Sequence, residues 1–214
     1  MMAHKRRVYF SETTRMGFEL FLISFLSLFF ELAFIRYIPG NVRYIAYYNN
    51  IILISAFLGL GTGCLRPGKQ FTMSLFPWLV TFTILLVILF KVLFVKPFSI
   101  IPSEYFIHGT FTAGIVPMEL AIPIIFTVNA MLFYPLGQKV GTLIGKFPPL
   151  TAYSVNISGN LLGVLVFALF SFFWVSPVTW FMIGFILSLF FFRRDKRSLV
   201  TALLLFAISL SAIF

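Results

Sequence analysis

Two carboxylates lie inside long apolar runs of the sequence, where an ionised group is costly. Glu31 stands in "LSLFFELAFIR" and Glu119 in "AGIVPMELAIPIIF". A carboxylate in the hydrocarbon of a membrane costs about 3 kcal/mol unless it is protonated or paired. Each position therefore predicts one of two things: a polar clamp that fixes how helices pack, or a site that binds a cation or a proton.

The first carboxylate has candidate partners in the next apolar run. Asn49 and Asn50 follow a turn predicted at Pro39-Gly40. By helix rise, Glu31 and this asparagine pair both lie about 10 Å below the same membrane surface. We predict that Glu31 accepts a hydrogen bond from this pair or from Arg43. The group is then either a clamp between two helices or a substrate or proton site.

The second carboxylate stands between Pro117 and Pro123, which interrupt a predicted span. Two prolines six residues apart free backbone carbonyls and kink a helix. Counted inward, Glu119 lies about 14 Å deep, and Asn160 lies about 15 Å from the opposite surface. We therefore expect these two to be level near mid-membrane, with Asn156 on the same helix face as Asn160. A binding site and a packing clamp stand as equal alternatives for this pair.

Small residues at four-residue spacing predict two helix faces that approach another helix closely. Ser55, Gly59 and Gly63 form one such seam in the second apolar run. Gly159 and Gly163 form another in the fifth run. Because these side chains are very small, the backbones of two membrane helices can come into contact there. Both seams are therefore predicted helix-packing sites.

The composition is typical of an integral membrane protein. Of 214 residues, 60% are hydrophobic and 10% are charged, whereas a soluble domain has about 25% charged residues. A spanning helix needs about 20 apolar residues. The apolar runs show no alternation of apolar and polar residues, which excludes a β-barrel. The predicted fold class is therefore an all-α polytopic membrane helix bundle with about seven transmembrane helices. The predicted spans cover about residues 17–38, 44–65, 72–95, 111–135, 150–173, 177–192 and 198–214.

The distribution of positive charge predicts the orientation. With a cytoplasmic N-terminus, twelve of the sixteen Lys and Arg residues lie inside, as the positive-inside rule requires. We predict a basic cytoplasmic tail over residues 1–16 and a transmembrane domain over residues 17–214, in a prokaryotic inner (plasma) membrane. This topology and the attraction to anionic lipid heads account for the net charge of +10. Nucleic acid is therefore not an expected partner.

Residues for catalysis or metal binding are scarce. The chain has one cysteine, Cys64, two histidines and six acidic residues, all scattered along the sequence. The sequence shows no nucleophile paired with a general base and no metal-ligand spacing, so no catalytic residue, metal or cofactor is expected. Segment 97–110, with Glu104 and His108, is predicted to lie in the membrane interface or to dip in from it.

Two stretches of the sequence resemble the membrane domain of the spermidine synthase-like membrane proteins. The similar features are "ELAFIR" in the first span, the glycine-rich end of the second and "AYSVNISGNLLG" opening the fifth. The resemblance implies a block of helices that precedes a domain similar to aminopropyltransferases. After Phe192 the chain has no glycine-rich turn for an S-adenosyl ligand and no aspartate pair for a polyamine. We therefore expect a stand-alone membrane module or a fragment, on which the family's catalytic residues have no positions.

Two functions follow as alternatives. The first is a non-catalytic membrane module that binds or transports a small cationic solute such as a polyamine, with Glu31 and Glu119 as the anionic groups. The second is an accessory or scaffold subunit of a larger membrane complex. The expected partners are the lipid bilayer and, in the second case, other membrane subunits or a separate soluble domain.

Overall fold

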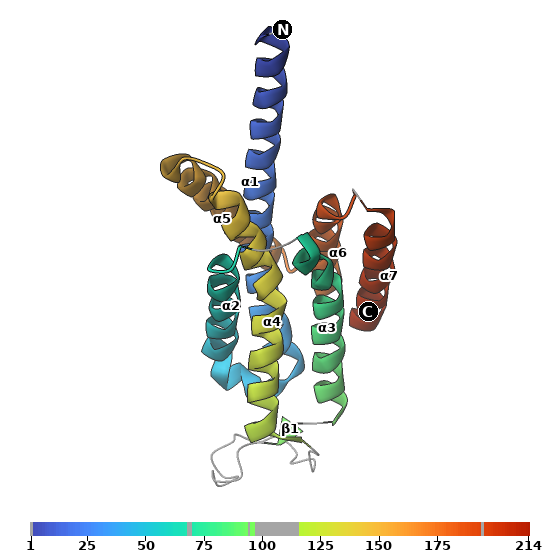
Figure 1. Ribbon diagram of the computed structural model, residues 1–214. Coiled ribbons are helices and arrows are strands. Elements are labelled where there is room, and N and C mark those ends of the chain that lie inside the picture. The colour runs from blue at the N-terminus through green and yellow to red at the C-terminus, as the bar shows by residue number, and fades with distance from the viewer. Residues whose placement is uncertain (1, 68–69, 94, 97–115, 194) are drawn as a thin grey trace.

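A computed structural model shows the chain as a bundle of helices (Figure 1). It describes residues 2–67, 70–93, 95–96, 116–193 and 195–214, and leaves out the side chains of residues 2–12, 43–44, 70–72 and 95–96. The α-helices are α1 (Met2–Asn41), α2 (Asn49–Cys64), α3 (Phe76–Leu93), α4 (Met118–Ile144), α5 (Pro149–Phe172), α6 (Pro177–Ser188) and α7 (Lys196–Ile213). Short 3₁₀ helices cover Arg43–Tyr48, Gln70–Leu75 and Leu189–Phe191. The all-α prediction is confirmed.

Six helical stretches in the described residues are long and apolar enough to cross a membrane. They are Thr13–Asn41, Ile45–Cys64, Met73–Leu93, Met118–Ile144, Pro149–Phe172 and Lys196–Ile213. The predicted sixth span is helical over Pro177–Phe191 but shorter than these. The chain is therefore an integral membrane protein whose described residues form seven α-helices, most of them long enough to span a membrane.

The predicted boundaries of the fourth span were wrong. The helix begins at Met118, directly after Pro117, and continues to Ile144. Both Pro123 and Pro135 lie inside it, whereas the prediction treated the first proline pair as an interruption in mid-span. Proline is well tolerated close to the start of a helix, where few backbone N–H groups have intrahelical acceptors. Segment 97–110, predicted to lie at the interface, falls outside the described residues.

The first helix is longer than predicted at both ends. Residues 2–16, predicted as a basic tail, continue α1 as helix and extend beyond the other helices (Figure 1). At the other end, Pro39 and Gly40 lie inside the helix and do not form the predicted turn. The side-chain amide of Asn41 donates to the Tyr37 carbonyl at 2.9 Å. This hydrogen bond satisfies one of the carbonyls that a helix C-terminus leaves without a donor.

The central element of the bundle is α1, which packs most extensively on α5 and also contacts α4 and α6. Its phenylalanines form the aromatic core: Phe34 meets Phe181 of α6 edge to face, with ring centroids 5.1 Å apart. Phe30 meets Phe76 of α3 at 5.4 Å. Phe29 meets Phe167 of α5 at 5.8 Å. A polar group on the inner face of α1 is therefore held among large apolar rings, far from water.

The last helix begins at an exposed cap. The carboxylate of Asp195 accepts hydrogen bonds from the backbone N–H groups of Arg197 and Ser198, at 3.1 and 3.3 Å, and from the Ser198 hydroxyl at 2.6 Å. The Ser198 hydroxyl and then the Arg197 N–H lower the pKa of the Asp195 carboxyl below its ordinary 3.8. A lowered pKa means that the cap stabilises α7 above about pH 4 and loses its effect as the pH falls further.

We predict that Asp195→Ala speeds hydrogen exchange of the first-turn amides of α7 several-fold at pH 7, because the capping acceptor is lost. Asp195→Asn is the matched control, since asparagine caps equally well and does not ionise. In the wild type, the protection should weaken below about pH 4, and in Asp195→Asn it should not. Exchange measured by mass spectrometry checks both results. Equal exchange in the alanine and asparagine variants would contradict the capping role.

Candidate functional site

Three polar side chains follow one buried face of α1. Ser24, Ser27 and Glu31 are spaced by three and four residues, which places them on the same side of a helix. All three are buried, and Glu31 is only 2% exposed. The Ser27 hydroxyl donates to the Ile23 carbonyl of its own helix at 2.8 Å. We call Ser24, Ser27 and Glu31 the α1 polar stripe.

Asn156 of α5 joins this stripe, whereas the sequence predicted it beside Asn160 in a site with Glu119. The Ser24 hydroxyl lies 2.8 Å from Asn156 Oδ1 and also 2.8 Å from the Leu20 carbonyl oxygen, and can donate to either acceptor. Ser24 is two helical turns from Glu31, or about 10 Å along the axis. Because α5 runs parallel to α1, Asn160 lies one turn closer than Asn156 to the level of Glu31. The structure thus brings Asn156 and the α1 polar stripe together.

The predicted pairing of Glu31 with the asparagines of the second helix was wrong. In the part of the chain that the structure describes, Glu31 makes no hydrogen bond or ion pair, and its Oε2 atom is buried without a partner. Asn49 and Asn50 are exposed at the start of α2. The 3₁₀ helix Arg43–Tyr48 precedes α2, so this asparagine pair stands in the first turn of α2 and not about 10 Å inside the span as predicted. The Arg43 side chain falls outside the described residues.

Glu119 does not lie at mid-membrane and does not meet Asn160. It is in the first turn of α4, next to the short parallel strand pair of β1 (Val95–Lys96) with β2 (Val116–Pro117). Asn160 lies in the middle of α5. The predicted level pairing of these residues was therefore wrong, since the fourth span starts later in the sequence than predicted. Glu119 belongs to the end of the bundle opposite to the N-terminus of α1.

A second buried polar site was missed. Asn129 of α4 is fully buried, and its amide nitrogen donates to Ser55 Oγ at 2.7 Å and to the Ile52 carbonyl at 3.1 Å. Its Oδ1 atom has no hydrogen-bond partner among the described residues. The signal in the sequence was a single asparagine in an apolar run, which was not among the predicted site residues. Ser55 therefore belongs to a polar contact as well as to the predicted seam.

Both predicted small-residue seams are confirmed as close helix contacts. A Cβ atom on Gly59 would lie 2.1 Å from the Ala130 carbonyl oxygen of α4, and one on Gly63 would lie 2.3 Å from that of Tyr134. On α5, a Cβ atom on Gly159 would lie 2.4 Å from the Phe21 carbonyl oxygen of α1, and Gly163 is similarly close to Phe25. Two α4 glycines, also four residues apart, complete the first seam and were not predicted: Gly137 and Gly141.

Basic residues gather at the end of the bundle from which α1 extends. Lys139 of α4 pairs with Glu19 of α1 at 3.2 Å, and Arg15 lies 3.5 Å from the same carboxylate. Arg193 stacks on the Phe190 ring, with its guanidinium carbon 4.0 Å from the centroid. The backbone carbonyl of Arg66 accepts a hydrogen bond from Gln138 of α4 at 2.8 Å. Four of the basic residues that the positive-inside rule assigned to the cytoplasmic side thus lie at the same end of the bundle.

At the other end of α1, Arg36 joins three helices. Its guanidinium donates to the Ser171 hydroxyl of α5. The guanidinium carbon also lies 5.3 Å from the ring centroid of Trp180 in α6, which is a cation–π distance. Arg36 therefore fixes the far ends of α5 and α6 against the helix that carries Glu31.

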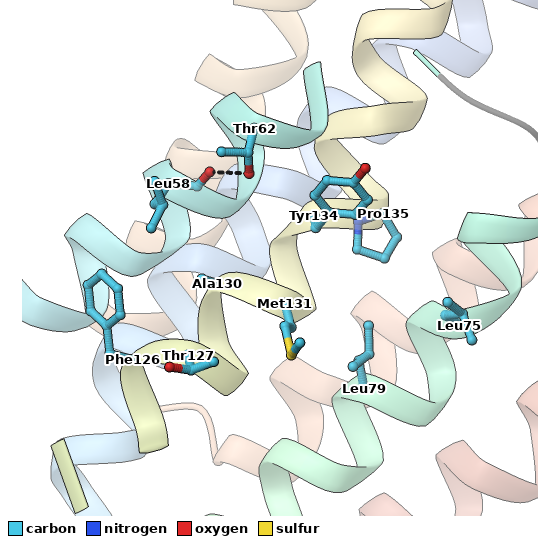
Figure 2. A pocket seen from close by; sticks show the side chains of 10 residues that line it. All are labelled: Leu58, Thr62, Leu75, Leu79, Phe126, Thr127, Ala130, Met131, Tyr134 and Pro135. Carbon is cyan, nitrogen blue, oxygen red and sulfur yellow. Dashed lines mark hydrogen bonds between the residues drawn. The ribbon is translucent and has the colours of Figure 1, made fainter. Parts of the chain in front are cut away.

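An apolar groove lies on the outer side of α4, between α2 and α3 (Figure 2). Its volume is about 540 Å³. Leu58 and Met131, which line it, are about half exposed. Thr62 and Tyr134 lie together at one end of the groove, and Phe126 with Thr127 at the other (Figure 2). None of the predicted site residues lines the groove, so it is separate from the α1 polar stripe.

Comparisons with known proteins give this site no precedent. No protein family matches the chain, and no similar curated protein or solved structure was found. In the described residues, no three His, Cys, Asp or Glu side chains are grouped so that they could hold a metal ion.

Proposed function

We propose that this chain is a non-catalytic integral membrane module that binds a small cationic solute at Glu31 and moves it across the bilayer. One observation carries the proposal: Glu31 is a carboxylate buried at 2% exposure, with no ion pair or hydrogen bond in the described part of the chain. A buried carboxylate is retained at a cost of several kcal/mol. A ligand that supplies positive charge and N–H donors removes that cost.

The neighbouring groups fit an ammonium ligand. Ser24 and Asn156 place oxygen atoms about two turns from Glu31 along α1. An alkyl chain with ammonium groups, such as a polyamine, can place one nitrogen at the carboxylate and another at these oxygens. The resemblance of "ELAFIR" and "AYSVNISGNLLG" to proteins with a separate aminopropyltransferase-like domain makes a polyamine the first ligand to test. Glu119 has no part in this site, because it lies at the end of α4.

The packing of the helices supports a route of access. The two tightest helix pairs are α2 with α4 and α1 with α5, and the contact between α1 and α4 is much smaller. Glycine seams bring the backbones of each pair into contact, and in our proposal each pair moves as one unit. Transporters open sites at mid-membrane by rocking one such unit against another. In our proposal, separation of α4 from α1 exposes Glu31 to one side of the membrane.

Uptake into liposomes tests this function. Wild-type protein should accumulate a radiolabelled polyamine, and Glu31→Gln should reduce uptake by at least about tenfold, because the amide cannot neutralise an ammonium group. Glu119→Gln is the matched control and should retain uptake, since it removes a carboxylate outside the α1 polar stripe. Equal uptake by wild type and Glu31→Gln would contradict the proposal.

The alternative function is an accessory or scaffold subunit of a larger membrane complex. The observation that favours it is the tight packing around Glu31, in which the carboxylate only fixes α1 within the bundle. In that case no tested cation should be taken up. A partner subunit or a separate soluble domain should then co-purify equally well with wild type and with Glu31→Gln.

A further inference from the structure

The geometry points to a second binding site: we propose that the apolar groove between α2, α4 and α3 holds an acyl chain of an anionic phospholipid whose phosphate binds Arg66. The groove is about 540 Å³ in volume and lies in the spanning part of the bundle. An α-helix is about 10 Å across, so this volume would hold little more than one helical turn. A single lipid chain therefore fits the groove better than a helix of another protein.

The polar end of the groove lies next to Arg66. Arg66 follows Thr62 by four residues and lies in the turn that ends α2, where its backbone N–H donates to the Gly63 carbonyl at 3.1 Å. The Arg66 carbonyl accepts from Gln138, which follows Tyr134 by four residues. Arg66 thus sits one turn, or about 5 Å, beyond the two hydroxyl-bearing residues at this end of the groove.

The guanidinium of Arg66 is available for a ligand. Arg66 is exposed, and across the described ranges its guanidinium makes no ion pair or hydrogen bond. Lys139, which is next to Gln138 on α4, is by contrast paired with Glu19 at 3.2 Å. A guanidinium binds phosphate through two parallel hydrogen bonds. The Tyr134 hydroxyl, which likewise has no hydrogen bond among the described residues, can donate to the ester oxygens of the same lipid.

The location matches the leaflet that carries anionic lipids. Arg66 lies at the same end of the bundle as Arg15 and Lys139, which the charge rule assigns to the cytoplasm. Anionic phospholipids are attracted to basic sites on that side. This inference does not rest on the proposed cation function, because the groove shares no residue with the α1 polar stripe.

Native mass spectrometry of the detergent-solubilised protein, titrated with phosphatidylglycerol or phosphatidylcholine, tests the proposal. Wild type should bind one phosphatidylglycerol molecule preferentially. Arg66→Gln should lower the affinity for phosphatidylglycerol about fivefold and leave that for phosphatidylcholine unchanged. This exposed substitution keeps the backbone carbonyl that bonds Gln138, so the fold is preserved.

Filling the groove provides a second measurement. Met131→Trp should abolish the preferential binding, because the larger side chain occupies the space of the acyl chain. Leu165→Trp, a change at a similarly exposed position on α5, should have no effect. Wild-type binding in either variant of the site would overturn the proposal. A wild-type dimer that Met131→Trp converts to monomer would also overturn it, since the groove would then hold a second copy of the chain.

Discussion

Gly59→Val should destabilise the protein by about 3 kcal/mol or more and prevent α2 from packing on α4. The reason is that even the first added atom, Cβ, would lie 2.1 Å from the Ala130 carbonyl oxygen and 3.0 Å from its carbon. These are backbone atoms, so no change of side-chain rotamer can relieve the contact. The two helices must move apart, and the Asn129–Ser55 hydrogen bond at 2.7 Å is lost with them.

Gly61→Val provides the control within the same helix. No atom lies within 4 Å of the position that a Cβ on Gly61 would occupy, so the same substitution should change stability by less than about 1 kcal/mol. Unfolding in detergent mixtures with increasing denaturing surfactant, followed by circular dichroism, measures both variants. Similar unfolding of the Gly59 and Gly61 variants would show that the seam is not a backbone contact.

Glu31→Met, unlike Gly59→Val, should stabilise the protein, by about 1–3 kcal/mol. Methionine has nearly the same shape as glutamate, but does not need a hydrogen-bond partner. A carboxylate clamped by donors would instead lose stability on this change. The same variant should lose cation uptake. The Glu31 carboxylate would then be needed for function although it lowers the stability of the fold.

The matched control for this prediction is Glu19→Met on the same helix. Glu19 is paired with Lys139 at 3.2 Å and with Arg15 at 3.5 Å, so its removal should destabilise the protein by about 1 kcal/mol. Chemical unfolding of both variants in the same detergent gives the comparison. A loss of stability in Glu31→Met would mean that the carboxylate has a bonding partner, and would remove the main support for a cation site.

Some features could be predicted from the sequence because they depend on local spacing. The seams of Gly59 with Gly63 and of Gly159 with Gly163 follow directly from four-residue periodicity. The burial of Glu31 follows from the apolar run around it. Which helix each seam contacts could not be predicted, because several helices carry small residues and only the packed bundle selects the pairs.

Other features depended on where each helix starts and ends. The prediction for Glu119 failed because it placed the fourth span seven residues too early, and a shift of that size moves a side chain by about 10 Å. The prediction for Asn49 failed because α1 continues through Pro39 and a 3₁₀ helix follows it, so that α2 begins only at Asn49. Asn129 was missed because nothing in its local sequence shows that it faces Ser55 of α2.

The pairing of helices that are distant in sequence has a consequence for how the protein is made. The Ser24–Asn156 contact joins residues 132 positions apart, and the Asn129–Ser55 contact joins residues 74 apart. At a synthesis rate of about 5–20 residues per second, α1 must wait about 7–26 seconds for α5. During that time the buried face of α1, with its carboxylate, is exposed to the insertion machinery or to lipid. Ribosome pausing between the second and fourth helices would lengthen this exposure, so the nascent chain is most open to degradation before its fifth helix is inserted.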